Sequence, residues 1–147
     1  MSSYTRVLVG TDGSETSYKA VDRAAAIAKA AGARLLIVSA YRPLSQREQQ
    51  EAAQQLGPEA YKVIGSHPAE DVLREACDRV GNGVDVDTIA LDGDPVDVLI
   101  RAATERKADL LVVGNRGLNS LTGRLLGSVP SVVTHRAPCD VLIVATT

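Results

Sequence analysis

The residues best suited to chemistry in this sequence are three glycines and a serine, spaced as Gly-x2-Gly-x9-Gly-Ser. They are Gly114, Gly117, Gly127 and Ser128. Because glycine lacks a Cβ atom, its backbone N–H group can come close to an anion. A helix that begins at Gly127 and Ser128 would add unpaired N–H groups and a dipole that favours phosphate. Whether these residues form a site depends on the elements that position them.

Composition limits the kinds of partner. The chain has 147 residues, of which 45% are hydrophobic and 23% charged, so one compact domain over 1–147 is expected. A net charge of −2 without a run of five like charges predicts no nucleic-acid partner. No leader pattern and no apolar run near the roughly 18 residues of a membrane span is present, which predicts a cytoplasmic protein without a membrane partner. Cys77 and Cys139 are expected to be small buried residues, and no metal site is predicted.

Apolar stretches alternate with helical periods along the chain, which indicates an α/β protein. Four stretches are almost continuous in Val, Leu and Ile, as in strands covered on both faces of a parallel sheet. The third alternates more and is expected near an edge. The predicted strands span residues 6–10, 34–40, 84–91, 109–114 and 140–146.

Helical signals fill the intervals between the predicted strands. Alanines at helical spacing predict a helix that ends at Gly32, and Asp94 with Pro95 predicts the start of another. Two more are expected, over about 68–80 and after Gly127 and Ser128. Right-handed connections turn this order into a doubly wound, five-stranded parallel sheet.

The winding of such a sheet places the candidate site. If the strand order is 3-2-1-4-5, the winding reverses between strands 1 and 4, and ligands bind beyond the carboxyl ends of the strands at that point. The loops GTDGS (10–14) and GNRG (114–117) follow those two strands. We therefore expect both glycine-bearing loops to meet at one crevice.

Residues 41–66 do not fit this pattern. The segment is long for a connection, is rich in Gln and Glu, and contains a possible short helix. It is interpreted as a flexible excursion after strand 2 that covers a site, or equally as a solvated surface segment without a role.

The combined motifs resemble the universal stress protein family. GxxxxGK[ST], GxGxxG and Ser-Gly-Gly-x-Asp-Ser loops are absent. The Gly-x2-Gly-x9-Gly-Ser spacing is that of nucleotide-binding family members, and residues 7–25 and 137–144 are similar as well. The resemblance covers nearly the whole chain except the excursion. It implies a half-Rossmann-like sheet of order 3-2-1-4-5 and a stress-response protein that binds ATP, with or without Mg²⁺. Similarity to a branch that also binds cyclic AMP makes cyclic AMP or AMP an alternative ligand.

The resemblance also implies the residues that bind the nucleotide. Thr11, Ala40 and Val113 would line the adenine side, and Asp12 would meet the ribose and phosphates. The competing interpretation of Asp12 is an Asx turn that opens the first helix, with Ser14 as its N-cap. Arg116 could neutralise outer phosphates. The full predicted set is Gly10, Thr11, Asp12, Ala40, Val113, Gly114, Arg116, Gly117, Gly127, Ser128 and Val129.

Two function classes remain open. The first is a module that senses or buffers adenine nucleotide through binding, and the second is a slow Mg-dependent ATPase that uses Asp12. Because Asp12 is the only obvious candidate base, binding is favoured and no catalytic residue is predicted. The last strand is apolar and β-branched, so a homodimer through this strand near Ile143 is expected, as the family pairs its final strands in this way.

Overall fold

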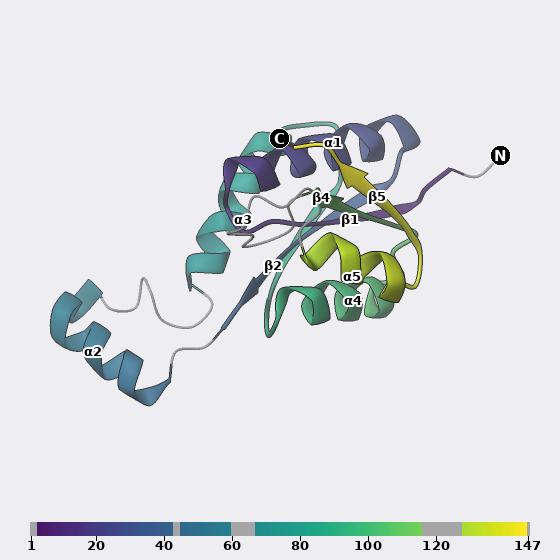
Figure 1. The fold of residues 1–147 in the computed structure, drawn as a ribbon. Helices are drawn as coiled ribbons and strands as arrows, with labels where there is room; N and C mark the ends of the chain where they lie inside the picture. The colour runs from purple at the N-terminus through teal and green to yellow at the C-terminus, as the bar shows by residue number, and fades with distance from the viewer. Residues whose placement is uncertain (1–2, 43–44, 60–66, 116–127, 147) are drawn as a thin grey trace.

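The computed structural model describes residues 3–42, 45–59, 67–115 and 128–146, except for the side chains of residues 67 and 128. Five parallel strands form one sheet (Figure 1): β1 (Arg6–Gly10), β2 (Arg34–Tyr41), β3 (Val86–Asp92), β4 (Leu110–Gly114) and β5 (Asp140–Val144). Their order is β3-β2-β1-β4-β5. The predicted α/β fold class and the predicted strand order are therefore confirmed.

Helices cover both faces of the sheet. The described helices are α1 (Glu15–Ala31), α2 (Gln46–Leu56), α3 (His67–Val80), α4 (Pro95–Glu105) and α5 (Ser128–Arg136). α1 and α3 pack on one face, and α4 and α5 on the other (Figure 1). The predicted caps are confirmed: Ser14 accepts a hydrogen bond from the Ser17 N–H, Gly32 has φ 66°, and Asp94 accepts from the Val96 N–H.

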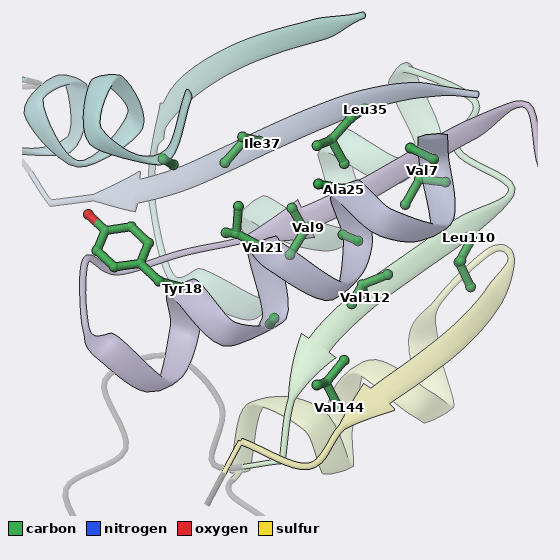
Figure 2. Close-up of a cluster of buried hydrophobic side chains, with 14 of the residues drawn as sticks. Val7, Val9, Tyr18, Val21, Ala25, Leu35, Ile37, Leu110, Val112 and Val144 are labelled. Atoms are coloured by element: carbon green, nitrogen blue, oxygen red, sulfur yellow. The ribbon is translucent and has the colours of Figure 1, made fainter. Parts of the chain in front are cut away.

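Small side chains allow α1 to pack closely on the sheet. Ala20, Ala24 and Ala28 are completely buried on the inner face of α1. In Figure 2, Val21 of the same helix lies among the buried side chains of β1 and β2, which include Val9. A fully buried Val contributes about 1.5–3 kcal/mol relative to an exposed one. The close packing of α1 on the sheet therefore supports the loops at the ends of the strands.

Some predicted boundaries and burials are wrong. β3 begins at Val86 and not at residue 84, although its predicted place at the sheet edge is correct. β5 ends at Val144 and not at residue 146, because Thr146 instead bonds to the Asn115 side chain. Cys77 and Cys139 are half-buried rather than buried, and burial raises the pKa of both thiols.

The excursion predicted over residues 41–66 contains α2, whose start is fixed by reciprocal hydrogen bonds between Ser45 and Glu48. α2 buries none of its residues and lies apart from the sheet in Figure 1. Residues 43–44 and 60–66 of the excursion lie outside the described ranges. Its flexibility and its covering of a site stay predictions. No helix in the described residues is long and apolar enough to cross a bilayer.

A single carboxylate joins the amino ends of β1 and β4. Asp109 accepts hydrogen bonds from the backbone N–H groups of Thr5 and Arg6, at 2.8 and 2.9 Å, and from the Thr5 hydroxyl at 3.0 Å. In return, the Asp109 N–H donates to the Arg6 carbonyl. Burial acts to raise the pKa of Asp109, but these hydrogen bonds outweigh it and hold the pKa below its ordinary value.

Asp109→Asn should therefore destabilise the protein in a pH-dependent way. A group with a lowered folded-state pKa stabilises above its unfolded pKa, and this contribution disappears as the pH falls through the folded value. After discounting for solvent exposure, we expect the variant to lose about 1 kcal/mol at neutral pH, with the difference from the parent shrinking below about pH 4.

Urea denaturation across this pH range measures the effect, and Asp78→Asn on the exposed side of α3 serves as the control. Equal losses for both variants, or a loss for Asp109→Asn that persists unchanged below pH 3, would contradict the role given to Asp109.

Candidate functional site

The candidate site lies where the winding of the sheet reverses. β1 and β4 pair in parallel, with Val7 opposite Leu110 and Val9 opposite Val112. Their carboxyl ends, at Gly10 and Gly114, therefore lie at the same end of the sheet. After β1 the chain enters α1, which lies on one face of the sheet, whereas α5 lies on the other face. The predicted meeting of the two glycine-bearing loops at one crevice stays a prediction, since residues 116 and 117 lie outside the described ranges.

Thr11 lies at the base of this region, and its polar atoms are used inside the protein. It is completely buried, and its N–H donates to the Val38 carbonyl at 2.9 Å. The Ser17 hydroxyl donates to the Ser14 carbonyl, so the Thr11 hydroxyl must donate to the Ser17 Oγ at 2.8 Å. The Gly13 N–H in turn donates to the Thr11 Oγ1. This network fixes the backbone between β1 and α1.

Asp12 lies at the surface of the same loop, half-buried. Its Oδ1 accepts a hydrogen bond from the Ser14 N–H at 2.9 Å, and Ser14 caps α1. This is the Asx turn of the competing interpretation, so Asp12 has a structural role. Its contact with a ribose or with phosphates stays a prediction.

Gly13 is a residue of this loop that the sequence interpretation missed. Its φ is +86°, and a Cβ atom built on it would lie 2.9 Å from the Val72 Cγ2 of α3. Both the conformation and the space therefore require glycine. The Asp-Gly pair is a common turn signal and could have identified the position, whereas the contact with Val72 has no local signal.

Gly114 lacks a side chain for a reason that the sequence did not indicate. A Cβ atom at this position would lie 3.1 Å from the Thr146 Cγ2, beyond the end of β5. Thr146 is almost completely buried, and both its N–H and its hydroxyl donate to the Asn115 Oδ1, at 3.2 and 2.9 Å. The Lys19 ammonium donates to the Thr146 carbonyl. Asn115 and Thr146, which the prediction did not include, thus join the segments that follow β4 and β5.

The remaining predicted residues differ in where they lie. Val113 and Val129 are buried in the core between the sheet and the α4–α5 layer, and Ala40 packs partly against it. Gly10 is buried at the end of β1, opposite Val38.

Ser128 is the first residue of α5, as predicted, but its side chain is not described. Arg116, Gly117 and Gly127 lie outside the described residues.

The described part of the site offers little for catalysis. In the described ranges, no three or more His, Cys, Asp and Glu side chains gather where they could hold a metal ion. His135 is exposed on α5 and its Nδ1 lies 3.0 Å from the Ser131 carbonyl of the same helix. The arrangement instead provides small and apolar residues at the strand ends, one carboxylate and the start of a helix.

The chain is similar to proteins of one family along nearly its full length. The model of the universal stress protein family matches residues 3–145. The universal stress protein Rv1636 of Mycobacterium tuberculosis is 53% identical over 149 residues, and the match covers all of both chains.

Two solved structures share the fold. A universal stress protein in complex with cyclic AMP is 44% identical, with a TM-score of 0.75 and coverage of 99% of this chain and 100% of the other. The protein UspA from Lactobacillus plantarum is 25% identical, with a TM-score of 0.76 and coverage of 98% and 99%.

Gly114→Ala should destabilise the protein through its contact with Thr146. A new methyl group 3.1 Å from the Thr146 Cγ2 overpacks a buried position, at a cost of about 1 kcal/mol. Thr146→Ser removes the Cγ2 atom but keeps the hydroxyl that binds Asn115. We therefore expect the cost of Gly114→Ala to fall in the Thr146→Ser background.

A double-mutant cycle by urea denaturation measures this coupling. If Gly114→Ala costs the same in both backgrounds, the need for glycine at this position does not come from Thr146.

Proposed function

Because the chain belongs to the universal stress protein family, we propose that it binds an adenine nucleotide at the crevice between the ends of β1 and β4. In this proposal, occupancy of the site, rather than turnover, carries the function. The observation that supports it most is the convergence of Gly10–Asp12 and Gly114 at the winding reversal. A relative of 44% identity that is solved with cyclic AMP adds support for an adenine ligand.

The strand ends would receive the nucleoside. Ala40 at the end of β2 is small and half-buried, and Val113 on β4 is apolar, so a flat base could pack between these strand ends without displacing a large side chain. The Asp12 carboxylate at the rim is an acceptor suited to ribose hydroxyls. The Thr11 hydroxyl is occupied by Ser17 and Gly13, so its part would be to hold the loop in place.

The start of α5 would receive the phosphates. The N-terminal N–H groups of a helix and its dipole favour an anion, and α5 begins at Ser128, the last residue of the glycine spacing. We propose that Gly114, Gly117, Gly127 and Ser128 hold the phosphate chain of ATP, with Arg116 near its outer end. Cyclic AMP or AMP would use the same nucleoside contacts with fewer phosphate contacts, and Mg²⁺ would enter with ATP.

The alternative function, a slow Mg-dependent ATPase, has less support. Phosphoryl transfer to water needs a group that orients or deprotonates the water. Asp12 is the candidate, but its Oδ1 holds the start of α1 through the Ser14 N–H. This hydrogen bond gives Asp12 a structural role that requires no catalysis.

Titration calorimetry with ATP, AMP, cyclic AMP and GTP tests the proposal. We expect ATP to bind, cyclic AMP to compete with it, and GTP to bind at least about tenfold more weakly, because a base-specific site leaves polar groups unpaired against the wrong base. Gly127→Ala should weaken ATP binding by about tenfold or more, since a Cβ atom would occupy the approach of a phosphate oxygen.

Gly57→Ala at the end of α2 is the control: a Cβ atom there meets no other atom within 4 Å, and the strain of its positive φ falls on a helix that buries none of its residues. This variant should bind ATP like the parent. Equal affinity for GTP would exclude an adenine pocket. ATP hydrolysis at roughly 1 per second or faster that disappears in Asp12→Asn would favour the enzyme.

We also propose that two copies of the chain pair through β5. This strand lies at an edge of the sheet, and Val141, Leu142 and Ile143 are each only half-buried in the single chain. An exposed apolar edge readily pairs with another strand.

Sedimentation velocity at micromolar concentration should therefore give the mass of a dimer, and Ile143→Pro should give a monomer, since proline removes a backbone donor and disturbs the edge. Circular dichroism checks that the variant is folded. A parent protein that sediments as a monomer, or a folded variant that remains a dimer, would exclude this interface.

A further inference from the structure

A second candidate site lies at the opposite end of the sheet from the crevice. A cavity of about 400 Å³ is bounded by the first residues of β1 and β2 and by the segment that follows α4. We call it the amino-end cavity. Four cations line it: Arg6, Arg34, Arg106 and Lys107. Two carboxylates, Asp87 and Glu105, also line it, which leaves a local excess of positive charge on a chain whose net charge is −2.

The strand register places two of these cations directly beside each other. Arg6 of β1 pairs with Arg34 of β2 in the parallel register, so both side chains leave the same face of the sheet. Like charges at such positions repel each other. Arg34 is paired with Asp87 at 3.0 Å, whereas Arg6 reaches only the Arg106 carbonyl, at 3.4 Å. The repulsion is therefore only partly relieved within the described protein.

Three of the cations have no carboxylate partner in the described ranges. Arg6, Arg106 and Lys107 form no ion pair with any residue that the structure describes. They come from two elements that are about a hundred positions apart in sequence and meet at the cavity. Guanidinium groups in such an arrangement match the oxygens of a phosphate, to which each can donate two hydrogen bonds.

The backbone at Lys107 is a second, independent observation. Lys107 has φ 54°, and among the described residues it is the only one other than glycine with a positive φ. It occupies the turn that ends α4, where the Ala108 N–H donates to the Ala103 carbonyl. Glycine is the usual residue in this turn, and α1 ends with Gly32 in that conformation. Here the chain instead carries a cation, at a cost in backbone strain, next to a cavity.

Apolar side chains complete the cavity. Leu8 and Leu36 are register partners on β1 and β2, on the same face as the two arginines. Both border the cavity, Leu36 with 9% of its surface exposed and Leu8 from within the core, where it is completely buried. A volume of about 400 Å³ is in the range of small-ligand sites. We propose that the amino-end cavity binds a small phosphate ester, with the phosphate held by Arg6, Arg106 and Lys107 and the organic part against Leu36, above the buried Leu8. This proposal does not depend on the nucleotide crevice.

Methyl NMR of the full chain with phenyl phosphate as the probe tests the proposal. The methyl signals of Leu8 and Leu36 should shift saturably, while those of Val113, at the crevice, should not shift with the same dissociation constant. Inorganic phosphate should bind several-fold more weakly than phenyl phosphate, because it has no apolar part to bury.

Two variants identify the residues involved. Arg6→Gln should weaken phenyl phosphate binding about tenfold, because it removes a charged donor. Arg23→Gln changes the net charge equally but lies on α1, on the other face of the sheet, and should stay within about twofold of the parent.

Lys107→Gly separates binding from folding. Glycine adopts the positive φ without strain, so the thermal midpoint of this variant should equal or exceed that of the parent while phenyl phosphate binding weakens several-fold. Absence of shifts at Leu8 and Leu36, shifts confined to Val113, equal weakening in Arg6→Gln and Arg23→Gln, or full binding by Lys107→Gly would each overturn the proposal.

Discussion

The pairing of β1 with β4 is the constraint on which the rest of this structure depends. It is the only contact through which the two halves of the sheet, β3-β2-β1 and β4-β5, join as neighbouring strands within the described residues. Three register pairs and the Asp109 hydrogen bonds to Thr5 and Arg6 hold it. Because the strands are parallel and in this register, the segments that follow Gly10 and Gly114 emerge side by side. A shift of this register would separate the two segments of the candidate nucleotide site.

Hydrogen bonds at the carboxyl ends of β1 and β4 then hold these two segments. On the β1 side, Thr11, Ser14 and Ser17 use their hydroxyls within the protein. On the β4 side, Asn115 accepts two hydrogen bonds from Thr146. Polar groups that are satisfied in this way cannot contribute their side chains strongly to a ligand, but they fix the backbone that would contact it. In the proposed nucleotide site, contacts with the ligand would therefore come mainly from the backbone and the strand ends.

The two ends of the strands differ in their polar and charged side chains and in how these side chains are paired. At the carboxyl ends, the Thr11 hydroxyl bonds to Ser17 and the Asn115 side chain bonds to Thr146. At the amino ends, Arg6, Arg106 and Lys107 surround a cavity without ion pairs in the described part of the chain. Asp109 lies near this second end, but it binds backbone N–H groups of β1 and its charge is used there. One parallel sheet thus presents different chemical environments at the two ends of its strands.

The sequence by itself determined the elements and their order, because each depends on local patterns: continuous apolar runs for β1, β2, β4 and β5, alanine spacing for α1, and caps such as Ser14 and Asp94. With the strand order 3-2-1-4-5 that the family resemblance implies, it also predicted that the segments after Gly10 and Gly114 meet. It did not reveal why Gly114 must be small, that Asn115 binds Thr146, that Val72 excludes a side chain at Gly13, or that Arg6 and Lys107 share a cavity. These contacts join residues that are 31 to 101 positions apart, and no local periodicity records such pairs. Only the packing of complete elements decided them.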